Sequence, residues 1–455
     1  MKRVVVVGGG IAGLTTALHL KDRAGAAGVE LDLEILEASD RPGGNIETDR
    51  TGGFVIEKGP NGFLDNVPAT PALVRRLGLE GSVQKADEAA AKRYLYRNGK
   101  LRLLPTGPLG FLRSPVLSLP GRLRVLAEPF ASGRPEGVDE SIFQFASRRI
   151  GDEAASILID AMVSGVFAGD VRRLSLASSF PRMAAMESEH GGLVKAMIAR
   201  MRERRRARRA VEARRRAGED VEELARPGGP AGPGGTLTSF REGLDTLPLA
   251  LARELGDRVR LGVKATAIRR GGSGPRWVVE VEGGERAPAD AVVVAIPSPR
   301  AAPLLRGLDP DLAGVIDEIP TAGLSVVALG YAAESMGGPP DGFGFLVPRG
   351  EGLRILGCLW DSSIFPGRGP RGRVLLRVMV GGAHDPEAVE EDQEVLVSQV
   401  RRELHQAMGV EGEPLLAKVY RWPLGIGQYT VGHGARIRRM EKRLGRLGPL
   451  WVAGS

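Results

Sequence analysis

The first 20 residues change from one hydrophobic pattern to another. Residues 4–7 are four consecutive valines, and such a run of β-branched side chains is typical of a parallel strand that is buried on both faces. Behind three glycines, apolar residues recur at helical intervals at Leu14, Ala17, Leu18 and Leu20. The pattern therefore predicts a buried strand, a tight turn and a helix, in that order.

The rest of the chain predicts helices in the middle and strands after them. Residues from about 68 to 217 carry helical patterns, and Asp139 or Ser141 would cap the helix that runs on toward Phe167. Strand patterns follow at 258–270, 277–284, 290–299, 324–331, 343–347, 353–361 and 374–382. The last four of these predicted strands are consistent with an antiparallel sheet that forms the floor of a substrate cavity.

The glycines behind the valines predict a dinucleotide site. Gly8, Gly10 and Gly13 have the G-x-G-x-x-G spacing, which permits the turn, lets the backbone approach a pyrophosphate and presents a helix N-terminus to the anion. Residues 31–38 predict a second strand that reaches Glu37, whose carboxylate would accept from a ribose hydroxyl. An acid there favours a ribose without a 2′-phosphate. A glycine turn with a solvated glutamate is the alternative interpretation.

Two further loops narrow the choice between a flavin and a nicotinamide dinucleotide. The sequence RPGGN follows at 41–45, and EKGPNGF occupies 57–63. An arginine and a glycine pair directly behind the ribose acid suit a flavin dinucleotide, whose second phosphate and isoalloxazine continue over a second loop. A nicotinamide-binding domain would not need them, although RPGGN alone is also compatible with a plain turn.

In this order of motifs the chain resembles the flavin monoamine-oxidase superfamily. More specifically, it resembles the family of protoporphyrinogen oxidases and their relatives that oxidise coproporphyrinogen. The segments that carry this resemblance span nearly the whole chain, at 57–63, 92–108, 160–183, 240–248, 341–348, 378–382 and 426–433. The stretch GVFAGD at 165–170 is especially distinctive, whereas the glycine motif occurs in many flavoproteins.

The resemblance implies an α/β fold with a two-dinucleotide-binding, Rossmann-like FAD domain. It also implies a helical insertion and an α+β substrate domain with an antiparallel sheet. We expect the FAD-binding domain to be discontinuous, at 1–67, 232–300 and 415–455. The helical insertion would occupy 68–231, and the substrate-binding domain 301–414.

The resemblance also implies which residues contact FAD. They are Gly8, Gly9, Gly10, Ile11, Ala12, Gly13, Glu37, Arg41, Gly44, Asn45, Gly59, Pro60, Asn61, Gly62, Ala265 and Trp422. Ala265 stands where the family usually has a valine that contacts FAD through its backbone, so this departure should matter little. The family continues beyond residues 451–454, WVAG, with a glycine-containing loop and a helix that closes the flavin site. We therefore expect this chain to be a fragment or to bind FAD weakly.

The implied reaction is a six-electron oxidation of protoporphyrinogen IX to protoporphyrin IX in heme biosynthesis, in three flavin-dependent steps. Oxygen would reoxidise the flavin and give hydrogen peroxide. Arg93 matches the family's substrate-side arginine, and a guanidinium is suited to a propionate. The implied pocket-lining residues are Phe167, Ala168, Gly344, Leu346 and Met379, each of which is alternatively an ordinary core residue. We assign no catalytic acid or base, because the cofactor itself is the electron sink.

Three other functions remain open. Coproporphyrinogen III is the alternative substrate, and a basic residue near the pocket mouth would favour it, but the sequence alone places none there. A flavin amine oxidase usually needs an aromatic cage and a lysine near the flavin, and aromatic residues make up only 5% of this chain. A non-catalytic flavoprotein is the third alternative.

Composition limits the number of domains, the disulfides and the metal sites that the chain can have. The chain has 455 residues, of which 42% are hydrophobic and 26% charged, as is typical of a soluble globular protein of two or three domains. Its single cysteine, Cys358, excludes an internal disulfide, and its five histidines have no metal-binding spacing, so we expect no metal. No signal peptide is evident, which favours the cytoplasm. The sequence is also compatible with a homodimer.

The net charge of +8 is concentrated in one segment. Residues 200–216 hold ten arginines against two glutamates, an excess equal to the charge of the whole chain. This segment predicts a charged helix followed by a Pro/Gly linker. The alternative interpretations of the helix are a solvated insertion, a segment that contacts an anionic membrane, and a segment that contacts nucleic acid. We expect no nucleic-acid partner, because this segment has almost no aromatic residues for stacking.

Residues 101–130 are a better candidate for contact with a membrane surface, on the inner face of the cell membrane. They place leucine, valine and phenylalanine among prolines, glycines and arginines, which is too interrupted to span a bilayer. The alternative is a hydrophobic lid over a pocket, and an apolar substrate could enter through such a lid from the membrane.

Overall fold

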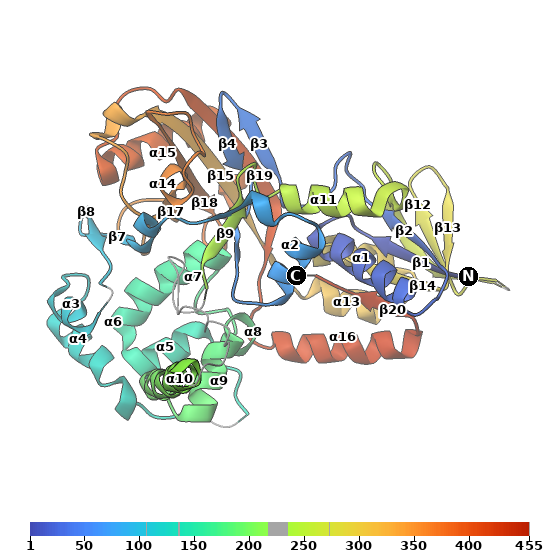
Figure 1. Cartoon of the computed structure of the whole chain (residues 1–455), viewed down its shortest axis with the longest axis horizontal. Helices are drawn as coiled ribbons and strands as arrows, with labels where there is room; N and C mark the ends of the chain where they lie inside the picture. Colours follow the sequence, from blue (N-terminus) through green and yellow to red (C-terminus); the bar gives the residue numbers. More distant parts are fainter. Residues whose placement is uncertain (106, 135–136, 217–234, 273, 455) are drawn as a thin grey trace.

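The structure is a computed structural model that describes residues 1–105, 107–134, 137–216, 235–272 and 274–454. Its elements gather into three parts in Figure 1. A parallel sheet with its covering helices contains the N-terminus, a mostly antiparallel sheet lies beside it, and a group of helices lies below this second sheet. This arrangement agrees with the predicted α/β fold and its helical insertion.

The parallel sheet confirms the strand predicted from the valines. Its spatial order is β10, β2, β1, β14 and β20, with bounds Val259–Arg260, Leu31–Leu36, Lys2–Val7, Ala291–Val294 and Leu450–Val452. In β1, Val4 and Val6 pack into one core and Val5 and Val7 into another, since successive side chains of a strand point to opposite faces. Both faces are therefore covered, which explains why all four valines are buried.

Helices and a small meander provide these two cores. Helices α1 (Ile11–Ala26) and α11 (Thr246–Leu255) pack together on one face. The other face carries a three-stranded antiparallel meander, as predicted, together with three further helices. These elements are β11 (Ala265–Arg270), β12 (Trp277–Val281), β13 (Arg286–Ala289), α12 (Ser298–Arg306), α13 (Pro310–Asp317) and α16 (His433–Leu447).

The second large sheet has seven strands and forms the floor of the candidate substrate cavity. In spatial order they are β19 (Leu416–Gly427), β15 (Thr321–Ala332), β18 (Arg373–Gly381), β17 (Gly357–Trp360), β16 (Gly344–Leu346), β7 (Tyr94–Arg97) and β8 (Lys100–Leu103). The strands predicted at 324–331, 343–347, 353–361 and 374–382 are all present in it. Helices α14 (Asp361–Ile364) and α15 (Gln393–Met408) complete this part.

β19, which belongs to the segment 415–455 predicted as part of the FAD-binding domain, pairs along its length with β15 of this sheet, and the division of the chain into domains stays a prediction. One sequence prediction fails at this sheet. The uniformly helical interpretation of 68–217 is wrong for β7 and β8, which form a hairpin. The turn of this hairpin, Asn98–Gly99, has positive φ angles of 52° and 72°, the geometry that an Asn-Gly pair favours between two strands.

The remaining part of 68–217 is mainly helical, as predicted. Its helices are α2 (Ala69–Arg76), α3 (Pro108–Arg113), α4 (Leu119–Leu126), α5 (Ile142–Ile150), α6 (Asp152–Ala154), α7 (Asp160–Phe167), α8 (Leu176–Ser179), α9 (Pro181–His190) and α10 (Leu193–Arg216). Ser141 caps α5 in a capping box with Gln144, so the second of the two predicted caps is the one used. A π-helical turn at Ala155–Ile159 joins α6 to α7.

The predicted arginine-rich helix is present as α10, whereas the predicted linker at 217–234 lies outside the described residues. Small sheets join the parts of the chain. They are formed by β3 (Thr48–Thr51) with β4 (Phe54–Glu57), and by β5 (Phe63–Leu64), β9 (Leu237–Phe240) and β6 (Val83–Lys85). Within the described ranges, the helices are all too short or too polar to cross a lipid bilayer.

Candidate functional site

The first glycine loop is shaped by close backbone contacts. A Cβ atom on Gly13 would lie 1.9 Å from the carbonyl oxygen of Gly8, so that only glycine lets α1 pack this close to β1. Gly10 differs, since the nearest atom to its hypothetical Cβ is the Cα of Gly44 at 3.9 Å. Ile11 and Ala12 begin the first turn of α1, whose N–H groups point out of the helix end. The open side of Gly10 is therefore the place where an anion can approach this helix end.

Glu37 is buried directly beside this loop. Its carboxylate accepts hydrogen bonds from the N–H of Gly9 at 2.6 Å and from the N–H of Ser39 at 2.9 Å. The Ser39 hydroxyl donates to the same oxygen as the Ser39 N–H, whereas the oxygen that accepts from Gly9 has a second lone pair, so Glu37 can also accept from a ribose hydroxyl. The N–H of Val263 donates to the carbonyl of Glu37 at 2.8 Å, which brings the start of β11 at Ala265 to the same end of the sheet.

The second glycine loop touches the first one through its backbone. The N–H of Gly43 donates to the carbonyl of Gly9 at 2.8 Å, and Gly43 and Gly44 both have positive φ. Arg41 folds back over its own loop, donating to the carbonyl of Gly44 at 2.8 Å and pairing with Glu47 at 2.7 Å. Arg41 therefore holds the loop in shape.

The third loop, at 57–62, connects this region to the antiparallel sheet. Trp422 of β19 donates from its indole N–H to the carbonyl of Lys58 at 2.7 Å. Arg377 of β18 donates to the carbonyls of Glu57 and Gly59, both at 2.8 Å. Both contacts fix the loop against the sheet of the second part.

Other predicted residues surround the same loop. Asn45 donates from its side chain to the carbonyl of Gly425 at 3.3 Å, and Pro60 is exposed. A Cβ on Gly62 would lie 2.6 Å from the carbonyl of Thr238, so this glycine is required for packing. The side-chain nitrogen of Asn61 is buried and has no hydrogen-bond partner in the described part of the chain.

These residues fit an extended dinucleotide. The helix end offers N–H groups to a pyrophosphate, the space beside Gly10 is open, and Glu37 can bind a ribose. The buried and unpartnered nitrogen of Asn61 indicates that a hydrogen-bond acceptor belongs at the far end of the site. The predicted cofactor residues are thus brought together along one continuous path.

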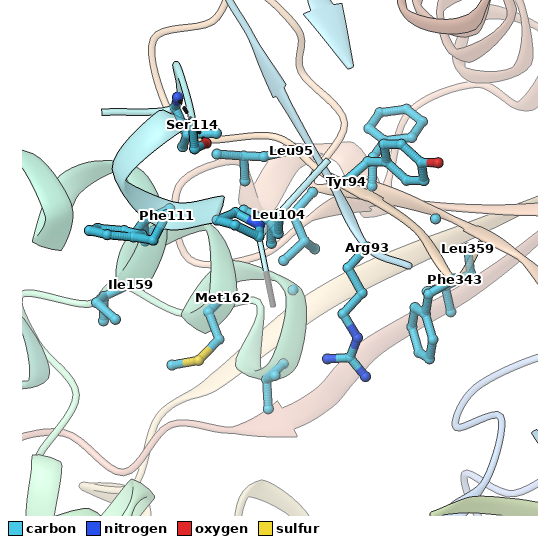
Figure 2. A pocket seen from close by; sticks show the side chains of 18 of the residues that line it. Arg93, Tyr94, Leu95, Leu104, Phe111, Ser114, Ile159, Met162, Phe343 and Leu359 are labelled. Carbon is cyan, nitrogen blue, oxygen red and sulfur yellow. Dashed lines mark hydrogen bonds between the residues drawn. The ribbon is translucent and has the colours of Figure 1, made fainter. Parts of the chain in front are cut away.

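A cavity of about 620 Å³ begins where this path ends, since Asn61 is one of its lining residues. Figure 2 shows this cavity, with side chains from β7, α3, α7 and the segment before β16 pointing into it. Its wall is mostly apolar, with Leu104, Phe111, Ile159 and Met162 among the side chains drawn. Such a wall suits a large hydrophobic ligand.

Arg93 lines this cavity, as do three of the other predicted pocket residues: Gly344, Leu346 and Met379. The guanidinium of Arg93 lies over the ring of Phe343, 4.7 Å from the ring centroid, and both side chains are drawn in Figure 2. Burial lowers the pKa of Arg93 from its ordinary value. Because the ordinary value is far above neutrality, the group still offers a charged, planar donor to a carboxylate.

Phe167 and Ala168 are not among the described residues that line the cavity. The ring of Phe167 packs edge-on against Phe180, and Ala168 ends α7 in a left-handed conformation with φ 46°. The carbonyl of Ala168 accepts from the N–H of Ala383 at 2.7 Å. Their contact with a substrate stays a prediction.

Sequence reasoning named few individual residues of the cavity wall, although its alternative interpretation of 101–130 as a hydrophobic lid over a pocket agrees with the lining residues that this segment supplies. The wall also includes Val116 and Leu117 near α4, and Leu158 and Ile159 from the π-helical turn, a kind of turn that is frequent at functional sites. It includes a second arginine, Arg122 of α4. These residues come from distant segments with ordinary helical patterns, and the π-turn has no local sequence signal that would have marked it.

The chemistry that the cavity allows follows from its charges. Among the described residues that line it there are two arginines and no aspartate, glutamate, histidine or lysine. The described wall therefore offers no carboxylate, imidazole or amine for general acid or base catalysis, and the hydroxyl of its Tyr94 donates to the carbonyl of Asp341 at 3.3 Å. It can bind a large apolar molecule with anionic groups next to the end of the dinucleotide path.

Comparisons with known proteins agree with this geometry. The profile of a family described as flavin containing amine oxidoreductase matches residues 11–455. Coproporphyrinogen III oxidase of Bacillus subtilis (strain 168) is 30% identical, over 98% of this chain and 92% of its own length. The chloroplastic protoporphyrinogen oxidase of Oryza sativa subsp. japonica is 34% identical, over 99% of this chain and 84% of its own. A solved structure from Exiguobacterium sp. 255-15 has a TM-score of 0.80 and 25% identity, and the match covers 99% of this chain and 93% of that one.

Proposed function

Because the chain belongs to the family of flavin containing amine oxidoreductases, we propose that it oxidises a porphyrinogen to a porphyrin in heme biosynthesis. FAD is its cofactor, and the chain is an oxidoreductase. Its substrate in this proposal is protoporphyrinogen IX or coproporphyrinogen III, the substrates named for its relatives.

One observation carries the proposal. An apolar cavity of about 620 Å³, with arginines as its charged lining residues, begins at the loop that ends the dinucleotide path. A porphyrinogen is a large apolar macrocycle with propionate groups, so it needs both an apolar wall and a guanidinium. An amine substrate is cationic and would be repelled by the positively charged arginines of this cavity.

The residues of this chain would bind and orient both molecules. Gly8 to Gly13, Glu37 and the Arg41 loop would hold FAD, and Asn61 would donate to it or to the substrate at the junction. Arg93 would hold a propionate so that one meso carbon faces the flavin. FAD, when bound, supplies the acceptor for the hydrogen that is removed with its electron pair.

The apolar wall would contribute by excluding water from this junction. The hydride transfer itself needs alignment and exclusion of water rather than a protein acid or base, and the proton that a pyrrole nitrogen loses in each step would pass to solvent. Oxygen would be the final electron acceptor in this proposal, and Phe167 and Ala168 would contact the substrate from the end of α7.

The proposal includes a peripheral membrane contact through α3, α4 and the turn after them. Leu109, Leu119, Leu123 and Phe130 are 72%, 59%, 56% and 90% exposed there, and Phe111 of the same segment lines the cavity. An apolar surface of this kind suits a lipid interface from which an apolar substrate could enter. A double variant, Leu119→Ser with Leu123→Ser, should reduce sedimentation with phosphatidylglycerol vesicles, whereas Leu415→Ser, exposed elsewhere, should not.

The experiment that tests the proposed reaction is anaerobic reduction of the bound flavin. Addition of protoporphyrinogen IX or coproporphyrinogen III should bleach the visible absorption of the flavin, and air should restore it with formation of hydrogen peroxide. Putrescine and cyclohexylamine are the matched controls and should leave the absorption unchanged. Bleaching by an amine, and by neither porphyrinogen, would overturn the proposal.

A further inference from the structure

Helix α4 turns an arginine inward and its leucines outward. Leu119, Leu123 and Leu126 are 59%, 56% and 44% exposed, whereas Arg122 is half-buried and lines the cavity. A surface helix ordinarily does the reverse, with charged residues facing water and apolar residues facing the core. The inward position of Arg122 therefore calls for a ligand or a protein partner.

The protein contacts of Arg122 orient its side chain without neutralising it. The Nε atom donates to the carbonyl of Ser118 at 3.3 Å, and one terminal nitrogen donates to the carbonyl of Leu112. No carboxylate of the described residues lies within ion-pair distance of Arg122, and its other terminal nitrogen has no hydrogen bond to a described residue. A charge held in an apolar wall in this way favours an anionic ligand.

Arg122 and Arg93 belong to opposite sides of the cavity. Arg122 bonds to Leu112, which lies beside Phe111 and Ser114, and Figure 2 shows those two residues on the side of the cavity away from Arg93. Leu104 and Met162 lie between the two sides. The cavity is thus an apolar space with a guanidinium contributed from each side.

We infer that Arg122 is a specificity-determining residue that binds a second carboxylate of the substrate and selects coproporphyrinogen III over protoporphyrinogen IX. This inference rests on the proposed function. Protoporphyrinogen IX carries propionates on two neighbouring pyrroles and vinyl groups on the other two, whereas coproporphyrinogen III carries a propionate on every pyrrole. With Arg93 bound to one edge of the macrocycle, Arg122 meets a carboxylate in coproporphyrinogen III and an apolar vinyl in protoporphyrinogen IX, which leaves its charge desolvated and unpaired.

Binding of the stable oxidised porphyrins tests the inference without turnover. Coproporphyrin III and protoporphyrin IX are titrated separately into the FAD-loaded chain, and the dissociation constants are read from porphyrin fluorescence. Arg122→Gln should weaken coproporphyrin III binding by about tenfold or more, as expected for loss of a charge-assisted hydrogen bond, and should change protoporphyrin IX binding little. Arg122→Lys keeps the positive charge and should lose less of the affinity for coproporphyrin III.

Matched controls separate this role from a structural one. Arg113→Gln, on the exposed surface of α3, should leave both dissociation constants unchanged, and Arg93→Gln should weaken both porphyrins. Unchanged coproporphyrin III binding in Arg122→Gln, or equal weakening of both porphyrins, would overturn the inference. If the Gln variant lost its flavin or its fold, Arg122→Met would decide, since unchanged coproporphyrin III binding in that variant would contradict selection by Arg122. Failure of the proposed function would appear separately, as absence of flavin reduction by either porphyrinogen.

Discussion

The guanidinium of Arg377 donates a hydrogen bond to the carbonyl of Gly59 at 2.8 Å, and this contact joins the antiparallel sheet to the cofactor loop. Arg377 is nearly fully buried, and its Nε atom donates to the carboxylate of Asp361 at 2.5 Å. A buried arginine with a buried acid and two carbonyl acceptors fixes the loop relative to the cavity floor.

Replacement of Arg377 should therefore affect stability and flavin retention together. Arg377→Met leaves Asp361 buried and unpaired, which should lower the free energy of unfolding by about 3–5 kcal/mol. Denaturant unfolding and the flavin-to-protein ratio measure the two effects. Arg373→Met is the control, because Arg373 is exposed on the same strand. Equal stability and flavin content in the two variants would refute this role.

Gly10→Val should remove FAD and spare the fold. Gly10 has an ordinary φ of −72°, and no atom lies closer than 3.9 Å to a Cβ at this position, so the apoprotein can accept a side chain. That side chain would occupy the space of the pyrophosphate. The variant should be colourless after purification with added FAD, while its melting temperature without FAD should match that of the wild type.

Gly25→Val is the matched control for Gly10→Val, because Gly25 lies in the same helix with nothing within 4 Å of a Cβ. It should retain flavin at the wild-type level. A yellow Gly10→Val variant would mean that the cofactor does not pass this loop.

Arg93→Ala should raise KM for a porphyrinogen more than it changes flavin content. Loss of a charge-assisted hydrogen bond to a propionate corresponds to about 1.5–3 kcal/mol, or about ten- to a hundredfold in KM. Steady-state kinetics with coproporphyrinogen III measure this increase in KM. Lys92→Ala is the control, since Lys92 is exposed and pairs with Asp341 outside the cavity lining. An unchanged KM in Arg93→Ala would remove its assigned role.

Asp49 should contribute stability that is lost in acid. Burial raises its pKa, but hydrogen bonds from Lys418 at 2.6 Å, Thr51 at 2.6 Å and Tyr420 at 2.8 Å outweigh it and lower the pKa from 3.8 to about 2. Because the folded-state pKa is the lower one, the stabilisation is present above a pH of about 4 and is lost as the pH falls toward 2.

Asp49→Asn should accordingly lower the free energy of unfolding by about 1–2 kcal/mol at neutral pH and by less near pH 2. Urea unfolding over a pH series measures this difference. Asp257→Asn, at an exposed site, should show no such loss. A loss in Asp49→Asn that is constant across the series would contradict the linkage to this carboxylate.

The parallel sheet could be predicted from the sequence because its signals are local. Four valines, the glycine spacing and Glu37 lie within 40 residues of each other, and each is a direct consequence of a strand buried on both faces next to a phosphate site. The antiparallel strands were predictable for a similar reason, since continuous apolar runs with turn residues between them mark each strand.

The hairpin of β7 and β8 was predictable but was missed. Asn98–Gly99 between two apolar segments is a strong hairpin signal, and the helical patterns on both sides of it favoured a single helical insertion. The membership of β19 in the antiparallel sheet was not predictable in this way, because strand pairing between residues about 100 positions apart has no local signature.

The polar contacts of the site were also outside the reach of sequence reasoning. Arg377 of β18 and Asp361, the first residue of α14, look like ordinary surface charges in the sequence. Arg122 lies in a helix whose apolar face points outward, so its hydrophobic pattern predicts the wrong orientation. Long-range packing decides both cases.

The most direct test of this account is the aerobic growth of porphyrin fluorescence when the purified chain, with added FAD, receives coproporphyrinogen III or protoporphyrinogen IX. The account predicts growth faster than autoxidation, with coproporphyrinogen III the faster substrate and Gly10→Val at the autoxidation rate. Growth at the autoxidation rate with both substrates, while the wild-type chain holds its flavin, would contradict it.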